Sequence, residues 1–536
     1  MEEGRKKQRM TRYVWVSLGI VLIITLILLG VGKIKNGARN TVTDEDSLAV
    51  LTMTPGVTTS PDVINTPTPE PTAAPTPTLS PTPTTTPTPT LSPTPTATPT
   101  PALDMSLFSS SETIPFISIV TEGEAPIISR ENYLNCEVTV GNTDEAYEMR
   151  DVQAGVRVRG NSSAYYGDVE KILTKQVPYR IKFEKKQNML GLNDGAECKS
   201  WVLLRGHEKE LVRDEIAFRL GTLFLGERYF SSDSQLVHLY VNGEFKGVYV
   251  LCEQPQINKY RITVNEPEEG ETGTDVGYLL EIDNAVDAED NPYFRMSYDD
   301  VVLTDVHGVK QQITYANYSV KSDTMSEKQV EFISSYMRNM FRLVYEACVN
   351  DNYLGFDGEY NLVPASYDNC KDTIEAVMDM DSVVAMYLVF EIMRDRDGGE
   401  GSFYMCVDFS EDSVYPKLTF LCPWDFSWTC QGEATGRYYA SGFDDQSFVD
   451  VYGDRSNPWF ILLGGEDWFM DLVREKWSGL QKETGAVYAC IDAERQYLET
   501  YEEDLNRKRS GVVNAAHDIL DWIERRVKWL DEEWLQ

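Results

Sequence analysis

Carboxylates gather in two short stretches in the second half of the sequence. The first, EIMRDRDGGEGSFYMCVD at 391–408, places Asp395 and Asp397 in a glycine-rich loop between a predicted helix and a predicted strand. The second, PKLTFLCPWDFSW at 416–428, places Asp425 directly after another predicted strand. One carboxylate of such a pair can orient a substrate hydroxyl while the other holds Mg²⁺ on nucleotide phosphates, as phosphoryl transfer requires. In the alternative interpretation, Asp397 caps a turn and Asp425 bonds only to backbone.

A hairpin would bring these two stretches together. Residues 403–407 and 417–422 both have the composition of strands. If they pair antiparallel, the start of the first strand lies about 5 Å from the end of the second. Asp397 and Asp425 would then face the same site.

A second group of polar residues suits an anion. RVRGNSS at 157–163 follows a predicted strand, and it offers the Arg159 guanidinium and backbone N–H groups to a phosphate. Lys182 lies within the predicted strand PYRIKF, from which a lysine can reach a phosphate. The alternatives are an ordinary turn or a glycosylation acceptor at N-S-S, and a lysine on the solvent face of a half-buried strand.

The elements that must position these residues fall into two halves. The first half is rich in strands and contains one helix with apolar spacing, at 211–226. Its strongest signal is LVHLYVNGEFKGVYVL at 236–251, where Asn242-Gly243 predicts a type I′ hairpin. The other strands of this half are predicted at 114–120, 155–160, 177–183 and 277–283. The second half is mostly helical, which makes the whole an α+β pattern, with helices predicted at 326–348, 381–394 and 466–535.

The N-terminal part is not predicted to be globular. Residues 13–32 are uncharged and rich in Leu, Ile and Val, and at about 1.5 Å per residue they span the ~30 Å core of a bilayer. Basic residues before them place the N-terminus in the cytoplasm, and a cleaved signal peptide is the alternative. Thr-Pro repeats between 52 and 101 predict a disordered Pro/Thr-rich stalk. We therefore expect a cytoplasmic N-terminus, a transmembrane helix, a linker with the stalk and one extracytoplasmic domain, at 1–12, 13–32, 33–104 and 105–536.

Composition narrows the range of partners. The chain has a net charge of −36, although its N-terminal segment is basic. An acidic surface repels nucleic acid and favours basic protein substrates or bound cations, with mere solubility as the alternative. The nine cysteines include no CxxC pair, so they are predicted to be buried thiols and not a disulfide framework or a zinc site. The four histidines are isolated in the sequence, which argues against a Ser-His-Asp triad.

A series of sequence blocks resembles, in order, the CotH (spore-coat protein H) kinase family. The blocks are RVRGNSS, PYRIKF followed by NMLGL, WVLLRG, LVRDEIAFRL, LYVNGEFKGVYVLCEQ, GYLLEID, the DGGEGSFYM loop, PWDFSW and the ending WIERRVKWLD. They span almost the entire globular region. The resemblance implies an atypical bilobal protein-kinase-like fold and transfer of phosphate from ATP to protein serines, with Mg²⁺ or Mn²⁺ as the metal.

The resemblance also implies roles for individual residues. Asp397 matches the catalytic-loop aspartate of the family, and Asp425 matches the metal-binding aspartate of its W-D-[FY]-D motif, with Asp395 as a further metal ligand. The protein substrate would be basic or Ser-rich. The residues implied in nucleotide or phosphate binding are Arg159, Asn161, Ser162, Lys182, Glu253 and Glu281.

Two positions depart from the family pattern. Asp395 stands where members usually have Asn, and Ser427 stands where the motif has its second Asp. The sequence therefore supports two hypotheses, a protein kinase domain displayed outside the membrane of a bacterium and a catalytically weak or inactive surface interaction or adhesion module on the same fold. A glycosidase with a carboxylate pair would suit an external location but has no support from the resemblance.

Overall fold

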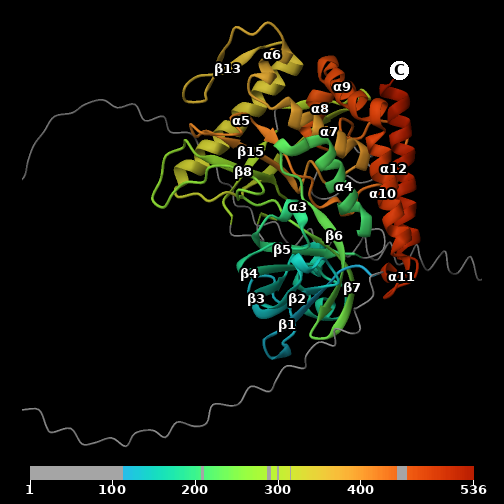
Figure 1. Cartoon of the computed structure of the whole chain (residues 1–536). Coiled ribbons are helices and arrows are strands. Elements are labelled where there is room, and N and C mark those ends of the chain that lie inside the picture. The colour runs from blue at the N-terminus through green and yellow to red at the C-terminus, as the bar shows by residue number, and fades with distance from the viewer. Residues whose placement is uncertain are drawn as a thin grey trace, which may run out of the picture. The chain divides into compact units, whose positions relative to one another are not determined.

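The computed structural model describes most of the chain beyond residue 112 (Figure 1). All of the described residues belong to one unit of the chain. Their hydrophobic core has two parts, one inside a barrel and one shared by a second sheet and the helices. The described residues are 113–206, 210–286, 291–298, 301–313, 315–443 and 456–535.

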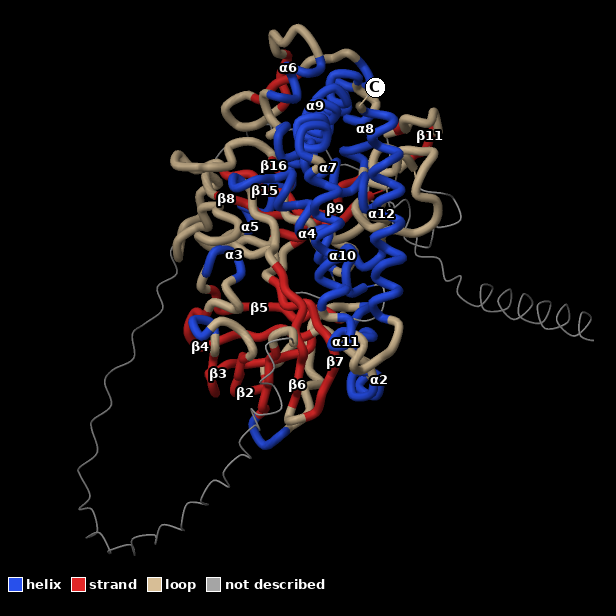
Figure 2. The backbone as a smooth tube through the Cα atoms, turned by 45° about the vertical axis from the view of Figure 1, so that its right-hand side comes forward, coloured by secondary structure: helices blue, strands red, loops and turns tan. Residues whose placement is uncertain are grey.

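The first seven strands close into a barrel (Figure 2). Around the barrel the order is β1-β2-β3-β4-β5-β7-β6, and β1 closes the ring by pairing in parallel with β6, with Phe116 opposite His238. All other neighbours are antiparallel. The strands are β1 (Phe116–Thr121), β2 (Leu134–Gly141), β3 (Met149–Val158), β4 (Tyr179–Gln187), β5 (Cys198–Arg205), β6 (Ser234–Val241) and β7 (Glu244–Cys252).

Side chains alternate between the two faces of each barrel strand. In β4, Ile181 and Phe183 are buried inside the barrel, whereas Lys182 between them is exposed. β7 is buried on both faces, because Tyr249 packs inside the barrel and Val250 packs in the second core. One side of the barrel is therefore covered by the rest of the unit.

Helix α4 (Glu210–Leu225) lies between the barrel and helix α7 (Met380–Met393) (Figure 2). Its apolar residues occur all round the helix and not in one stripe, as expected for a helix buried on nearly all sides. Its charged residues Arg213, Asp214 and Glu215 are nevertheless 8%, 5% and 1% exposed. Each of these charges needs a partner inside the protein.

A second, antiparallel sheet has the order β16-β15-β8-β12-β9. On β15, next to its edge strand β16, the ring of Phe403 lies 5.3 Å from that of Phe390 on α7 and 4.9 Å from that of Phe420 on β16. These edge contacts between aromatic rings fix the end of α7 against the sheet. The remaining strands are β8 (Gly277–Ile282), β9 (Tyr293–Ser297), β10 (Val302–Thr304), β11 (Lys310–Gln312), β12 (Tyr315–Val320), β13 (Leu354–Phe356), β14 (Leu362–Pro364), β15 (Phe403–Asp408) and β16 (Thr419–Phe420).

The C-terminal helices connect the second core to the barrel (Figure 1). Helices α10 and α12 contact α4. After α11, the Lys508 Nζ donates to the carbonyls of Phe245 and Lys246, each at 3.0 Å. Arg507 donates to the Tyr240 hydroxyl at 3.2 Å. The other helices are α2 (Val169–Thr174), α3 (Leu192–Gly195), α5 (Glu327–Asn350), α6 (Cys370–Glu375), α8 (Pro458–Gly464), α9 (Asp467–Thr484), α10 (Ala486–Thr500), α11 (Glu502–Leu505) and α12 (Val512–Trp534).

The main elements predicted from the sequence are confirmed. The helix predicted at 211–226 is α4, and the hairpin predicted at 236–251 consists of β6 and β7. Its turn residues Asn242 and Gly243 have φ of 50° and 77°, the positive values that a type I′ turn requires. The two short strands of the acidic region pair antiparallel as β15 and β16.

The predicted fold class, an α+β bilobal protein-kinase-like fold, is wrong. The structure mixes helices and strands, and its first part is a closed seven-stranded barrel that the prediction did not include. Alternation identifies strands one at a time, but it does not report that β1 and β6, far apart in the sequence, pair and close the ring. No helix among the described residues is both long and apolar enough to cross a bilayer. The predicted transmembrane helix at 13–32 and the stalk lie outside the described residues.

Two buried glutamates lie close together between α4 and α10. Glu215 and Glu494 are 1% and 0% exposed. Burial, followed by the charge of Glu494, raises the pKa of Glu215 well above its usual value. Arg219 pairs with Glu494 at 3.1 Å, so a single arginine faces two carboxyl groups. The folded state therefore keeps a proton that the unfolded chain releases.

We expect Glu215→Gln to stabilise the fold, and to do so more strongly as the pH rises. A carboxyl group whose pKa is raised in the folded state destabilises the fold as the pH rises from the usual pKa of 4.5 toward the pKa in the folded state. Each raised unit costs the ionised folded state about 1.4 kcal/mol. The free energy of unfolding in urea should therefore exceed that of the wild type by at least about 1 kcal/mol at about pH 8, and by less at about pH 5.

The exposed Glu227 provides the matched control for this substitution, because Glu227→Gln removes the same charge near the end of the same helix. The control should change the free energy of unfolding little at either pH. If Glu215→Gln raised the free energy of unfolding equally at both pH values, this would contradict the inference that the buried pair holds a proton in the folded state.

Candidate active site

The loop after α7 is held in a tight turn by its own backbone. The N–H groups of Glu400 and Gly401 both donate to the carbonyl of Asp397 at 2.8 Å. Gly398 lets the turn lie against α7, because a Cβ there would be 2.3 Å from the Cε1 atom of Phe390. The aspartates of this loop are therefore fixed relative to α7.

The turn after β16 is held by α4. Asp425, with φ of 59°, directly precedes one 3₁₀ turn, η7 (Phe426–Trp428). The first backbone N–H of η7 donates to Asp214 Oδ1 at 2.8 Å. Arg213 donates to the carbonyl of Ser427 at 2.6 Å. Two charged side chains of α4 therefore determine where Asp425 lies.

Four aspartates lie close enough together for their charges to affect one another's pKa. We call these residues, Asp214, Asp395, Asp397 and Asp425, the acidic cluster. Burial raises the pKa of Asp395 well above its usual value, and the charges of Asp397 and Asp425 raise it further. Burial, followed by the charge of Asp425, raises the pKa of Asp214 to about 7. Asp397 and Asp425, which the predicted hairpin was expected to juxtapose, therefore both lie near Asp395.

Asp395 has an oxygen that suits a cation. Its Oδ1 is buried and has no hydrogen-bond partner among the described residues, a costly state for a carboxylate unless a cation or a proton satisfies it. Oxygen ligands of this kind are those that Mg²⁺ and Mn²⁺ prefer. The acidic cluster therefore fits a hard divalent cation. It is not a closed cage, because in the described part of the chain the one group of three potential ligands within 4.8 Å of one another lies elsewhere.

Arg159 brings a positive charge to the acidic cluster. It follows β3, and its backbone N–H donates to the carbonyl of Pro178 at 3.0 Å. Its Cζ lies 5.2 Å from the ring centroid of Trp424, the residue before Asp425. Burial dominates the pKa of Asp214, and the charge of Arg159 opposes it. A guanidinium next to carboxylates can bind the phosphate groups of a metal-bound ligand.

The rest of the RGNSS motif makes local contacts. Asn161 Oδ1 accepts a hydrogen bond from Arg130 Nη2. Ser162 is exposed at the start of a 3₁₀ turn. Within the described residues, Arg159 is therefore the member of this motif that interacts with the acidic cluster.

Three further residues implied in nucleotide binding lie in other networks. Lys182 is exposed on the outside of the barrel, with its Nζ 5.9 Å from the centroid of a tyrosine ring. Glu253 pairs with Arg261 at 2.8 Å, and both side chains are fully buried. Glu281 pairs with Lys321 at 2.8 Å. These contacts tie the two glutamates to neighbouring basic residues, and the nucleotide roles of all three residues stay predictions.

Asp214 is absent from the residues that the sequence motifs predicted. Its signal in the sequence is the run Arg213-Asp214-Glu215 inside an otherwise apolar helix. Charges in a helix that is buried all round must have partners, and two of these three residues hold the turn that carries Asp425.

Comparison with known proteins identifies the family. The CotH family, described as CotH kinase protein, matches residues 156–530. Curated proteins give no match to the chain. The matched range covers more than half of the chain and contains Arg159 and the whole acidic cluster, and the chain therefore belongs to the CotH kinase family.

Proposed function

We propose that this protein is a phosphotransferase that moves the terminal phosphoryl group of ATP to a serine hydroxyl of a protein, with Mg²⁺ or Mn²⁺ bound. Membership of the CotH kinase family supports kinase chemistry at the level of the family. The observation that carries the proposal is the buried Oδ1 of Asp395, unpartnered within the described residues, in an acidic cluster next to Arg159.

Each residue of the site would have its own role in phosphoryl transfer. Asp425 and Asp395 would hold the metal ion, which when bound supplies positive charge to the phosphate oxygens. Arg159 would bind phosphate oxygens through its guanidinium. Asp397 would orient the serine hydroxyl and take up its proton. Asp214 would act through the backbone N–H after Asp425, by keeping that carboxylate in position.

A second candidate function is a catalytically weak or inactive interaction module. It is favoured by Ser427, whose Oγ donates to Asp425 Oδ1 at 3.0 Å. This hydrogen bond occupies an oxygen that a metal ion would use, at a position where the family motif has a carboxylate. The extracytoplasmic location stays a prediction, because the segment from which it was inferred lies outside the described residues.

We expect Asp397→Asn to abolish phosphoryl transfer while leaving nucleotide binding nearly unchanged. A residue that positions the attacking hydroxyl acts mainly in the transition state. Asp425→Asn should weaken both, because it removes a ligand of the metal ion that binds the phosphates. Transfer is measured as self-phosphorylation with labelled ATP and Mg²⁺ or Mn²⁺, and binding as the rise in melting temperature with nucleotide.

Asp412→Asn is the matched control, because Asp412 is exposed in the connection at the opposite end of the β15–β16 hairpin. It should keep both transfer and binding. Full transfer by Asp397→Asn would show that the catalytic assignment is wrong and would make Asp395 the residue to test. No nucleotide effect on the melting temperature of the wild type would favour the interaction module.

We expect Ser427→Asp to raise the rate of transfer or to change the preference between Mg²⁺ and Mn²⁺. The substitution removes the hydrogen bond to Asp425 and adds the carboxylate of the family motif. Ser427→Ala separates these effects, because it removes the hydrogen bond alone. If both variants keep the wild-type rate and metal preference, Ser427 does not limit the site.

A further inference from the structure

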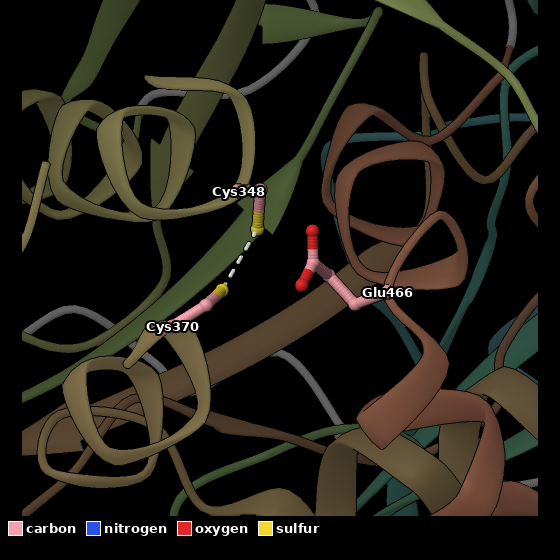
Figure 3. Close-up of side chains that lie close together, drawn as sticks. All are labelled: Cys348, Cys370 and Glu466. Carbon is pink, nitrogen blue, oxygen red and sulfur yellow. Dashed lines mark hydrogen bonds between the residues drawn. The ribbon is translucent and has the colours of Figure 1, made fainter. Parts of the chain in front are cut away.

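Two cysteines and a glutamate from three separate helices meet beside the second core (Figure 3). Cys348 lies in the last turn of α5, Cys370 is the first residue of α6, and Glu466 directly precedes α9. The two Sγ atoms are 3.7 Å apart. A carboxylate oxygen of Glu466 and both sulfurs all lie within 4.8 Å of one another. In the described part of the chain, no other group of three Cys, His, Asp or Glu ligands is as close together.

The distance between the sulfurs is compatible with two thiolates on one metal ion. Zn²⁺ binds thiolate at about 2.3 Å with tetrahedral angles, which sets two bound sulfurs about 3.8 Å apart. A disulfide would need the sulfurs at about 2.05 Å. The observed 3.7 Å agrees with the first geometry and not with the second.

Glu466 is oriented by a neighbour on α9. The indole Nε1 of Trp468 donates to Glu466 Oε2 at 3.0 Å. The backbone of Glu466 is also fixed, because its carbonyl accepts from the N–H groups of Phe469 and Met470, each at 3.1 Å. A hydrogen bond of this kind to a ligating carboxylate is a regular feature of metal sites.

The three groups also contact one another directly. The Sγ atoms of Cys348 and Cys370 are within hydrogen-bond distance of each other, and the side chain of Cys370 hydrogen-bonds to that of Glu466. A divalent cation would replace these contacts, since it binds the deprotonated groups and releases their protons.

We propose that Cys348, Cys370 and Glu466 bind one Zn²⁺ ion, with water as the fourth ligand, in a site that ties together α5, α6 and α9. Cys348 and Glu466 are partly exposed, so the ion and the water can reach the site from solvent. None of these three helices carries a residue of the acidic cluster. The Zn²⁺ site is therefore separate from the acidic cluster, and the proposal for it does not depend on the proposed phosphotransfer.

The test uses the whole chain, freed of metal with a chelator and kept reduced with a phosphine. The reduced chain should take up one Zn²⁺, and Co²⁺ should give the charge-transfer absorption of bound thiolates, which the aspartates of the acidic cluster cannot produce. Cys348→Ser and Cys370→Ser should each lower this absorption per bound Co²⁺ to about half and weaken Zn²⁺ binding at least about tenfold. Cys490→Ser, which alters a partly exposed cysteine on α10, is the matched control and should bind as the wild type does.

A milder variant keeps the test decisive if a cysteine variant does not fold. Trp468→Phe removes the indole N–H that orients Glu466, and it should weaken Zn²⁺ binding about tenfold while keeping the thiolate absorption with Co²⁺. The proposal is overturned if the reduced wild type shows no thiolate absorption with Co²⁺. It is equally overturned if mass spectrometry of the unreduced chain finds Cys348 joined to Cys370 and the reduced chain takes up no Zn²⁺.

Discussion

The acidic cluster depends on the burial of one helix that carries charges. α4 contacts the barrel, α7, α10 and α12, so the buried charges of Arg213, Asp214 and Glu215 are kept from water and need partners inside the protein. Arg213 and Asp214 find their partners in the backbone of η7. The same bonds that satisfy these buried charges hold Asp425, and the packing of α4 against α7 sets the distance to the loop of Asp395 and Asp397. The hydrogen bonds that satisfy the buried charges of α4 are therefore the same ones that set the geometry of the site.

The sequence predicts the individual elements better than their assembly. Alternating residues identify five of the seven barrel strands, all except β2 and β5, and Asn242-Gly243 identifies the hairpin, because both signals are local. The pairing of β15 with β16 follows from the same reasoning, and it brings Asp397 and Asp425 to one end. Closure of the barrel could not be predicted this way, since it depends on a parallel pair between distant strands.

The candidate site shows the same division. Asp397, Asp425 and Arg159 come from motifs with a chemical rationale. The two aspartates belong to the acidic cluster, and Arg159 interacts with it. Asp214 lies in the block LVRDEIAFRL, to which the sequence analysis assigned no role, and its role becomes recognisable once α4 is known to be buried on nearly all sides. Lys182 shows the opposite case, because its place in a strand suggested a phosphate contact, while the pleat turns it to the outside of the barrel.

Backbone strain gathers in the segments that carry the acidic cluster. Arg394, Ser402, Cys422, Asp425 and Cys430 all have positive φ, a conformation that costs a non-glycine residue about 1 kcal/mol or more. Such residues keep this conformation only where their surroundings hold them. The aromatic packing around α7 and the hydrogen bonds from α4 provide that restraint.

The pairing of β1 with β6, which closes the barrel, affects the order of folding during synthesis. β1 is the first barrel strand to be made, but its partner β6 follows only after four more barrel strands and α4 have been translated. Until then one edge of β1 is open to pairing with other chains, and joining such distant segments is slow because the entropy of loop closure is lost first. The contacts of Lys508 with the β6–β7 hairpin form later still, so a nascent chain completes this side of its barrel only after Lys508 has been translated.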